Sequence, residues 1–218
     1  MQSQIFRIVF EDSQILVIEK LRPFLSQRAD SGNQEGIDEF MARALGFKIY
    51  AVHRLDRDVL GLMIFGKSEA AARSLSEQFK LRGVRKMYWA RVRGRVFADS
   101  ATLIHFLAKN PKTKKVTVYP RETPGAKRAE LRYHVIDRQG AVTDLLIDLK
   151  TGRTHQIRAQ LAKIGHPILG DLVYGRSSEE SEAIQLKSVF LSVCHPQTNE
   201  VLEWSLMLDR DLKNFFVL

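Results

Sequence analysis

The sequence is poor in the residues that build disulfides and metal sites. It has a single cysteine, Cys194, so no intramolecular disulfide can form, and this is typical of a protein in a reducing compartment. Cys194 follows the mostly apolar run 189–193, which favours a buried thiol over a catalytic nucleophile. The six histidines are not spaced as metal ligands and no Cys-x-x-Cys occurs, so no metal site is predicted.

Long hydrophobic runs are also missing. No stretch approaches the roughly 20 apolar residues that a membrane-spanning helix needs. The N-terminal sequence MQSQIFRIVFED lacks the charged start and apolar stretch of a secretory signal peptide. The sequence therefore predicts a soluble, cytoplasmic protein that does not bind membranes, with a monomer as the default oligomeric state.

Positive charge is abundant and unevenly distributed. The chain has 34 Lys and Arg residues against 25 Asp and Glu residues, a net charge of +9. Residues 80–128, called here the basic region, hold 14 basic and two acidic residues, so this region carries +12 and the remainder −3. Such asymmetry is typical of a protein that binds a polyanion, most often a nucleic acid. The alternative is a solvated basic face.

The pattern of apolar residues predicts a mixture of strands and helices. With 218 residues and 44% hydrophobic content, the chain can form one large core or two small ones. Turns of hairpin length and the lack of a linker predict a single α+β catalytic domain over residues 1–218, on a mixed, mostly antiparallel sheet flanked by helices. Strands are predicted at 5–10, 15–18, 49–52, 60–65, 87–92, 131–136, 143–149, 189–193 and 202–206, helices at 37–45, 68–79 and 154–164, and loops at 110–115, 121–127 and 177–182.

The most informative stretch is 148–175, DLKTGRTHQIRAQLAKIGHPILGDLVYG. Thr154 is predicted to cap a helix through its hydroxyl group, and Gly165 to end that helix. Arg158 lies one turn from Thr154 and His155, so polar side chains gather at the helix start, where an anion is stabilised. The alternative is an amphipathic helix whose polar face is simply solvated.

An acidic residue stands in a cationic turn between two predicted strands, in the sequence HRLDRD at 53–58. Asp56 is flanked by Arg54 and Arg57, which favour its ionised form. Asp56 is therefore a candidate nucleophile or base. The alternative is a turn aspartate that caps backbone amides beside surface ion pairs.

Three separate segments together resemble the RluA-type family of pseudouridine synthases. AVHRLDRDVLGLMIFGKS at 51–68 resembles the family's His-Arg-Leu-Asp motif, and KMYWARVRG at 86–94 resembles its Lys-x-Tyr-x-Ala-x-Val-x-Gly strand. The third segment, 148–175, follows the family's pattern almost throughout. The resemblance covers nearly the whole chain and implies a pseudouridine synthase fold that isomerises a specific uridine in structured RNA, either ribosomal or transfer RNA.

The resemblance also implies roles for individual residues. Asp56 would be the nucleophile, Tyr88 would stack on the uracil and assist proton transfer at C5, and Arg158 would form an ion pair with Asp56. Arg54 would contact RNA near the extruded nucleotide, and Arg153 and His155 would either shape their loop or bind phosphate. The residues expected to contact RNA are Arg54, Arg57, Lys86, Lys112, Lys114, Lys115, Arg153 and His155, while His166, Gly170 and Asp171 are expected to be structural turn residues.

The reaction needs no cofactor, because it breaks the bond from ribose to N1, rotates the base and rejoins it through C5 without a redox step. A uridine in folded RNA must first be flipped out, which costs a few kcal/mol. Phosphate contacts from the basic region are expected to offset this cost.

The sequence departs from the family at several positions. Val59-Leu60 replaces the usual Thr-Ser, residues 20–23 read Lys-Leu-Arg-Pro where Lys-Pro-x-Gly is usual, and Leu186-Lys187 replaces Leu-His. The lost hydroxyl groups near Asp56 leave open a non-catalytic RNA-binding or RNA-chaperone module on the same scaffold. A hydrolase that cleaves a glycosidic bond is disfavoured, because such enzymes use two carboxylates and the sequence offers no second candidate beside Asp56. Because the chain starts at the first strand, no separate N-terminal RNA-binding domain is expected.

Overall fold

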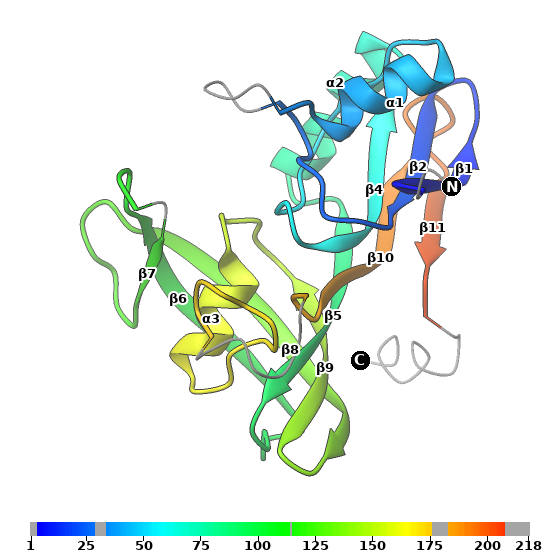
Figure 1. Ribbon diagram of the computed structural model, residues 1–218. Coiled ribbons are helices and arrows are strands. Elements are labelled where there is room, and N and C mark those ends of the chain that lie inside the picture. The colour runs from blue at the N-terminus through cyan, green and yellow to red at the C-terminus, as the bar shows by residue number, and fades with distance from the viewer. Residues whose placement is uncertain (1–3, 29–33, 114, 176–182, 208–218) are drawn as a thin grey trace. The chain divides into compact units, whose positions relative to one another are not determined.

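The structure is a computed structural model that describes residues 4–28, 34–113, 115–175 and 183–207 (Figure 1). The chain forms two compact units. Unit 1 combines the chain up to Arg85 with the chain from Ser188 onward, and unit 2 runs from Lys86 to Lys187.

Unit 1 is a sheet with helices, and its elements are β1 (Phe6–Glu11), β2 (Ile15–Lys20), α1 (Ile37–Leu45), β3 (Tyr50–Ala51), β4 (Leu60–Gly66), α2 (Glu69–Lys80), most of β10 (Leu186–Cys194) and β11 (Val201–Ser205). The strand order is β1-β2-β4-β10, with β3 paired to β4 and β11 to β10. β2 and β4 are buried almost throughout, and α2 packs against β4. A strand buried on both faces has no polar side, so residues 15–18 of β2 and most of β4 form apolar runs, while β2 ends in the buried Glu19 and Lys20.

The predicted ends of both helices in unit 1 are confirmed. The hydroxyl group of Ser68 accepts a hydrogen bond from the backbone N–H of Ala71 at 3.1 Å and caps α2. Gly46 ends α1 in the left-handed conformation, with φ of 78°. Both ends depend on local chemistry, and for that reason the sequence alone is sufficient to place them.

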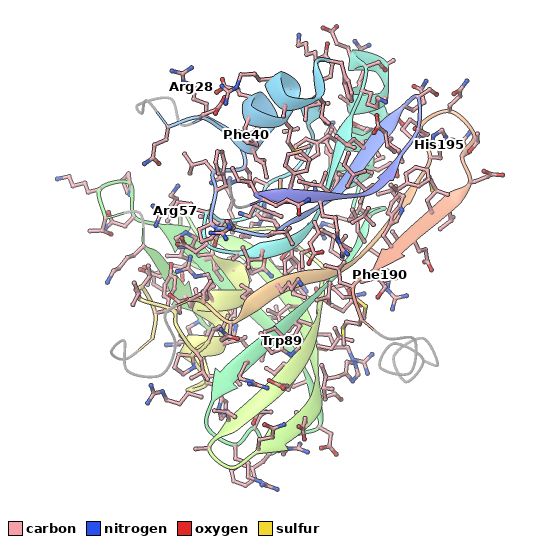
Figure 2. The ribbon with its side chains drawn as sticks, turned by 45° about the vertical axis from the view of Figure 1, so that its right-hand side comes forward. Arg28, Phe40, Arg57, Trp89, Phe190 and His195 are labelled. Carbon is pink, nitrogen blue, oxygen red and sulfur yellow. The ribbon has the colours of Figure 1, made fainter. Side chains whose placement is uncertain are left out.

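Two turns of unit 1 are joined by a buried histidine (Figure 2). His195, in the turn between β10 and β11, places Nε2 3.0 Å from Asp12 Oδ2, in the turn between β1 and β2. Its Nδ1 accepts the backbone N–H of Thr198 at 3.0 Å. The backbone N–H groups of Gln14 and Ile15 donate to Asp12 Oδ1. Hydrogen bonds through Asp12 and His195 therefore connect the β1–β2 turn to the β10–β11 turn.

Unit 2 is an antiparallel sheet in the order β5-β9-β8-β6-β7, with α3 packed against β6 and β7 (Figure 1). β5 confirms the predicted alternation, because Tyr88, Ala90 and Val92 are buried and Trp89 is half-buried on the opposite face. The elements are β5 (Arg85–Arg93), which begins at the boundary with unit 1, β6 (Ser100–Lys109), β7 (Val116–Tyr119), β8 (Lys127–Gln139), β9 (Val142–Leu149) and α3 (Gln156–Lys163).

The fold is α+β, as predicted, but two of its strands were not predicted from the sequence. These strands are β6 and β7. The prediction missed β6, SATLIHFLAK, because it buries only Leu103 and Leu107 and shows no clean alternation of apolar and polar residues. β8 is also longer than predicted, with an irregularity between Val135 and Asp137 that interrupts its period. The predicted acidic loop at 177–182 lies outside the described residues.

Candidate active site

The candidate nucleophile, Asp56, is half-buried in the turn that joins β3 to β4 in unit 1. Its neighbours Leu55 and Val59 are both 3% exposed, so the turn is fixed by apolar packing on each side. The backbone N–H of Val59 donates to the carbonyl oxygen of Asp56 at 3.1 Å. Val59 thus supports the turn by burial where the family usually has a hydroxyl group. A Cβ on Gly61 would overlap the carbonyl oxygen of Ser188, so glycine is required there.

The segment after β2 binds the backbone on both sides of Asp56. Ser26 Oγ donates to the carbonyl oxygen of Leu55 at 2.6 Å and accepts the N–H of the same residue at 2.9 Å. The N–H of Phe24 donates to the carbonyl oxygen of Arg57 at 3.0 Å. These bonds hold residues 55–57 against the β2–α1 connection.

A buried lysine completes this arrangement. Lys20 is fully buried, and its Nζ donates to the carbonyl oxygens of Phe24 at 3.0 Å, Asp56 at 3.0 Å and Arg57 at 2.9 Å. An ammonium group has three N–H donors, and here each has a carbonyl acceptor. Burial lowers the pKa of Lys20 to about 8, although the charges of Asp56 and Asp58 oppose this shift. No role was predicted for Lys20, although it stands at the lysine of the family's Lys-Pro-x-Gly pattern.

Activity is expected to fall about fivefold as pH rises through about 8, because neutral Lys20 keeps two N–H donors and loses one carbonyl hydrogen bond, worth about 1 kcal/mol. Stability should change in the opposite direction. The pKa of Lys20 in the folded chain lies below the ordinary value of 10.5, so the unfolded chain binds more protons between these two pH values. The free energy of unfolding therefore increases as the pH rises through this range. The check is the pH profile of the maximal rate beside thermal unfolding.

Lys20→Arg is the matched variant for this experiment, because a guanidinium group stays charged throughout the pH range. We expect the alkaline fall to disappear in this variant if it folds. A wild-type rate that stays constant from pH 7 to 10 would contradict the assignment, as would a fall that coincides with unfolding.

The cationic neighbours of Asp56 have separate roles. Arg57 is exposed and its Nε lies 3.1 Å from Asp58 Oδ1, so it forms the surface ion pair considered as an alternative (Figure 2). Arg54 is exposed. His53 is structural: its Nε2 accepts the N–H of Ile64 at 3.0 Å and its ring stacks on Phe79. A ring nitrogen that accepts a hydrogen bond carries no proton, so His53 is neutral while this bond is present.

In unit 2, the candidate stacking residue Tyr88 lies in β5 opposite Ile147 of β9 and is 7% exposed. On the other face of β5 lies Trp89 (Figure 2). Arg91 lies over the ring of Trp89 and forms two hydrogen bonds of 2.8 Å with Asp144. Arg91 is therefore neutralised by a carboxylate in its own sheet. Arg128 is likewise paired with Glu130 at 2.7 Å. The charge count of the basic region thus overstates the charge available for RNA.

Lys86 lies close to the loop that leads into α3. Burial lowers the pKa of Lys86. Its Nζ would lie 3.7 Å from a Cβ added at Gly152. Arg153 in the same loop is exposed, and its Nε donates to the carbonyl oxygen of Arg128 at 3.2 Å. The structure thus places Lys86 and Arg153 at one loop, and their predicted contacts with RNA stay predictions.

The helix α3 begins one residue later than predicted and is capped differently. The residue at the N-cap is His155, in the left-handed conformation with φ of 51° and without a side-chain capping bond, so the prediction for Thr154 is wrong. Instead, Gln156 Oε1 accepts hydrogen bonds from the N–H of Arg153 at 3.0 Å and from Thr151 Oγ1 at 2.7 Å. Gly165 follows the helix with φ of 89°, as predicted.

The polar face of α3 is buried rather than solvated. Gln156, Arg158 and Gln160 are all at most 6% exposed. Arg158 donates from Nε and Nη2 to the two carboxylate oxygens of Asp171, each at 2.8 Å. Burial alone would raise the pKa of Asp171, but the hydrogen bonds and charge of Arg158 hold the pKa below its ordinary value. Asp171 was predicted to be a turn residue only, and this ion pair was not foreseen.

The loop between β6 and β7 presents lysines to solvent. Asn110 Oδ1 accepts the N–H groups of Lys112 at 2.9 Å and Thr113 at 3.0 Å, and the N–H of Asn110 donates to the carbonyl oxygen of Lys115 at 2.8 Å. Lys112 and Lys115 are exposed, and Lys114 lies outside the described residues. The loop is therefore closed by the Asn110 side chain and one backbone bond, and Lys112 and Lys115 are exposed on it.

The described part of the chain contains neither a membrane-spanning helix nor a metal cluster. No helix in it has the length and apolar character needed to cross a membrane. No group of three or more His, Cys, Asp or Glu side chains within these residues could hold a metal ion.

The chain is similar to a known family along most of its length. A model of the family described as RNA pseudouridylate synthase matches residues 14–163. The chain is 31% identical to the uncharacterised RNA pseudouridine synthase YjbO of Bacillus subtilis, covering 94% of this chain and 73% of that protein. It is 32% identical to ribosomal large subunit pseudouridine synthase D of Buchnera aphidicola (97% and 71% covered). It is 33% identical to the dual-specificity RNA pseudouridine synthase RluA of Vibrio vulnificus (88% and 79% covered).

Solved structures extend the similarity to the fold. Human RNA Pseudouridylate Synthase Domain Containing 1 superimposes with a TM-score of 0.80 at 22% identity, covering 100% of this chain and 98% of that one. Human RNA Pseudouridylate Synthase Domain Containing 4 gives a TM-score of 0.74 at 20% identity, covering 96% and 92%. At these identities the structures support the fold alone.

Proposed function

We propose a substrate and a mechanism from the premise that this chain belongs to the RNA pseudouridylate synthase family, of the RluA type, and is an RNA pseudouridine synthase. The proposed substrate is a specific uridine in folded ribosomal or transfer RNA. The proposal treats residues 1–218 as one catalytic domain. The observation that carries it is the Asp56 turn, where a half-buried carboxylate stands on a backbone bound by Lys20 and Ser26.

Asp56 is the proposed nucleophile. Attack of its carboxylate on ribose C1′ allows the bond from C1′ to N1 to break, and C5 displaces the carboxylate after the base has rotated. The proton on C5 is then lost and N1 is protonated, so the atoms balance without an added group. A backbone that is fixed before the substrate binds keeps the carboxylate at its place of attack, which lowers the entropic cost of the reaction.

Tyr88 and Arg158 have the supporting roles. Tyr88 stacks on the flipped uracil and assists removal of the C5 proton, and Arg158 pairs with Asp56. Arg158 donates from Nε and Nη2 to Asp171, and its pairing with Asp56 is assigned from the resemblance of residues 148–175 to the family's motif. The exposed lysines of the β6–β7 loop, with Arg54, bind the phosphates that flank the flipped uridine.

The loop lysines should control affinity rather than chemistry. We expect replacement of Lys112, Lys114 and Lys115 by Ala to weaken RNA binding and to reduce the slope of log affinity against log salt by about 0.7 for each phosphate that is no longer neutralised. Turnover at saturating RNA should stay nearly unchanged, because this loop is not assigned to the base. Binding measured at several salt concentrations, beside single-turnover rates, provides the check.

Lys48→Ala is the matched control, since Lys48 is exposed but lies outside the basic region. It should leave the salt slope intact. An unaltered slope in the triple variant would mean that the loop is solvated and RNA is bound elsewhere. Lost turnover at saturation would instead place the loop at the chemistry.

The proposed function is tested directly with purified protein and transcripts of ribosomal and transfer RNA labelled with tritium at uridine C5. Isomerisation releases the C5 tritium into water, so release at a stoichiometry of one per transcript, from one class of RNA, is the expected result. Tight binding to RNA without tritium release would favour the non-catalytic module instead.

A further inference from the structure

We propose that Asp171 and Tyr174 form a rigid holder for the guanidinium group of Arg158, and that Tyr174 is a positioning residue that anchors this holder to β7. The inference rests on the proposed function, in which Arg158 acts on Asp56. All the contacts that support it lie within unit 2.

Asp171 fixes the guanidinium group in its own plane. Its two oxygens accept from Nε and Nη2 of Arg158, and its side chain has no exposed surface. Oδ1 also accepts the backbone N–H groups of Val173 at 2.9 Å and Tyr174 at 3.1 Å. The carboxylate therefore cannot rotate without breaking several hydrogen bonds. A planar, bidentate ion pair of this kind defines both the position and the orientation of the arginine.

The same guanidinium group lies over the ring of Tyr174. The Cζ atom of Arg158 lies 5.4 Å from the centre of the Tyr174 ring, which is within the range of a cation–π contact. The ring is partly buried against a small cluster that includes Val116 of β7 and Ala159 of α3. Asp171 thus holds the guanidinium group by two hydrogen bonds, and the ring of Tyr174 packs beside it.

The hydroxyl group of Tyr174 attaches this ring to two other elements. Its oxygen accepts the backbone N–H of Val116, the first residue of β7, at 2.9 Å. The same oxygen lies 3.0 Å from Nδ1 of His155, the N-cap of α3. The Tyr174 hydroxyl oxygen thus contacts both the first residue of β7 and the N-cap residue of α3.

The bond to His155 also explains an unusual backbone conformation. His155 is one of few residues other than glycine with positive φ among the described residues, and such residues persist where surrounding contacts hold them. Tyr174 supplies that contact at the residue where α3 begins. The N-cap of α3, the start of β7 and the guanidinium group of Arg158 therefore all contact the side chain of Tyr174, and its hydroxyl group makes two of these contacts.

A fixed arginine matters for rate more than for RNA binding. If Arg158 must be correctly placed when the reaction occurs, then loosening its holder lowers the chemical rate and leaves the affinity for RNA unchanged. A tyrosine that merely stabilised unit 2 would act on folding and would have no particular relation to Arg158. A double-mutant cycle distinguishes these roles.

The test compares wild type, Tyr174→Phe, Arg158→Lys and the double variant by single-turnover rates at saturating RNA. Tyr174→Phe keeps the ring over Arg158 and removes only the hydroxyl group. We expect its rate to fall about fivefold to tenfold, with RNA affinity within about twofold and the folded state retained. In the Arg158→Lys background, the same change should lower the rate by less than about twofold, because the group that Tyr174 positions is already gone.

Tyr119→Phe is the matched control, since it removes another hydroxyl group at the far end of β7. It should have the wild-type rate. Equal losses for Tyr174→Phe in both backgrounds, or a wild-type rate for Tyr174→Phe, would overturn the holder while leaving the proposed function standing. A wild-type rate for Arg158→Lys would overturn the proposed role of Arg158 itself, and with it the holder.

Discussion

Asp56→Asn is expected to abolish pseudouridine formation, with a loss of about 10⁴-fold or more, as when other enzymes lose their nucleophile. An amide has nearly the same shape as a carboxylate but cannot attack the ribose. The turn should survive, because the hydrogen bonds that Lys20 and Val59 donate to Asp56 are made to its backbone oxygen. RNA affinity should therefore stay within a few-fold of wild type. Tritium release and RNA binding, measured on the same preparation, check both parts.

Asp58→Asn is the matched control for this variant. Asp58 is half-buried in the same turn and pairs with the exposed Arg57, so the same chemical change falls two residues away. It should leave most activity intact. Wild-type turnover in Asp56→Asn would remove Asp56 from the chemistry. Equal losses in the two variants would mean that the charge of the turn, rather than one nucleophile, is what matters.

Arg158→Lys is expected to lose about 100-fold in rate, although the positive charge is kept. Lysine ends in a compact ammonium group, which cannot form the two parallel bonds that Arg158 makes with Asp171. A fully buried carboxylate would then lose one of its two hydrogen bonds from the arginine, which also destabilises unit 2. The group that should hold Asp56 would become mobile. Single-turnover rates and thermal unfolding check the two consequences.

The control is the same substitution at another arginine that forms a bidentate ion pair with a carboxylate. Arg91 makes an equivalent pair with Asp144 on the outer face of β5, where no role in the reaction is assigned. Arg91→Lys should reduce activity less than twofold. Full activity in Arg158→Lys would show that the arginine's geometry is not required, while a comparable loss in Arg91→Lys would attribute both effects to stability.

Local chemistry determines the parts of the fold that could be predicted. Ser68 caps α2 through its own side chain, and Gly46 and Gly165 end helices by adopting a conformation that glycine favours. The alternation in β5 is equally local. β6 could not be found in this way because only Leu103 and Leu107 are buried, and the strand exists by pairing with β8.

The site was predictable where its residues form motifs and not where distant residues meet. Asp56 stands out in its cationic turn, but Lys20 binds the carbonyl oxygen of Asp56 from 36 positions earlier in the chain. Arg158 stands out in α3, yet its partner Asp171 lies 13 residues further on and looks like part of a turn. Thr154 has a hydroxyl group that could cap the helix, but Gln156 Oε1, within α3, accepts the backbone N–H of Arg153 instead.

The most direct test of the central claim is a pseudouridine map of total RNA from cells with this gene, without it, and without it but restored with wild type or with Asp56→Asn. The account predicts that pseudouridine at one or a few positions disappears when the gene is removed, returns with wild type and does not return with Asp56→Asn. Identical maps in all four strains would contradict it.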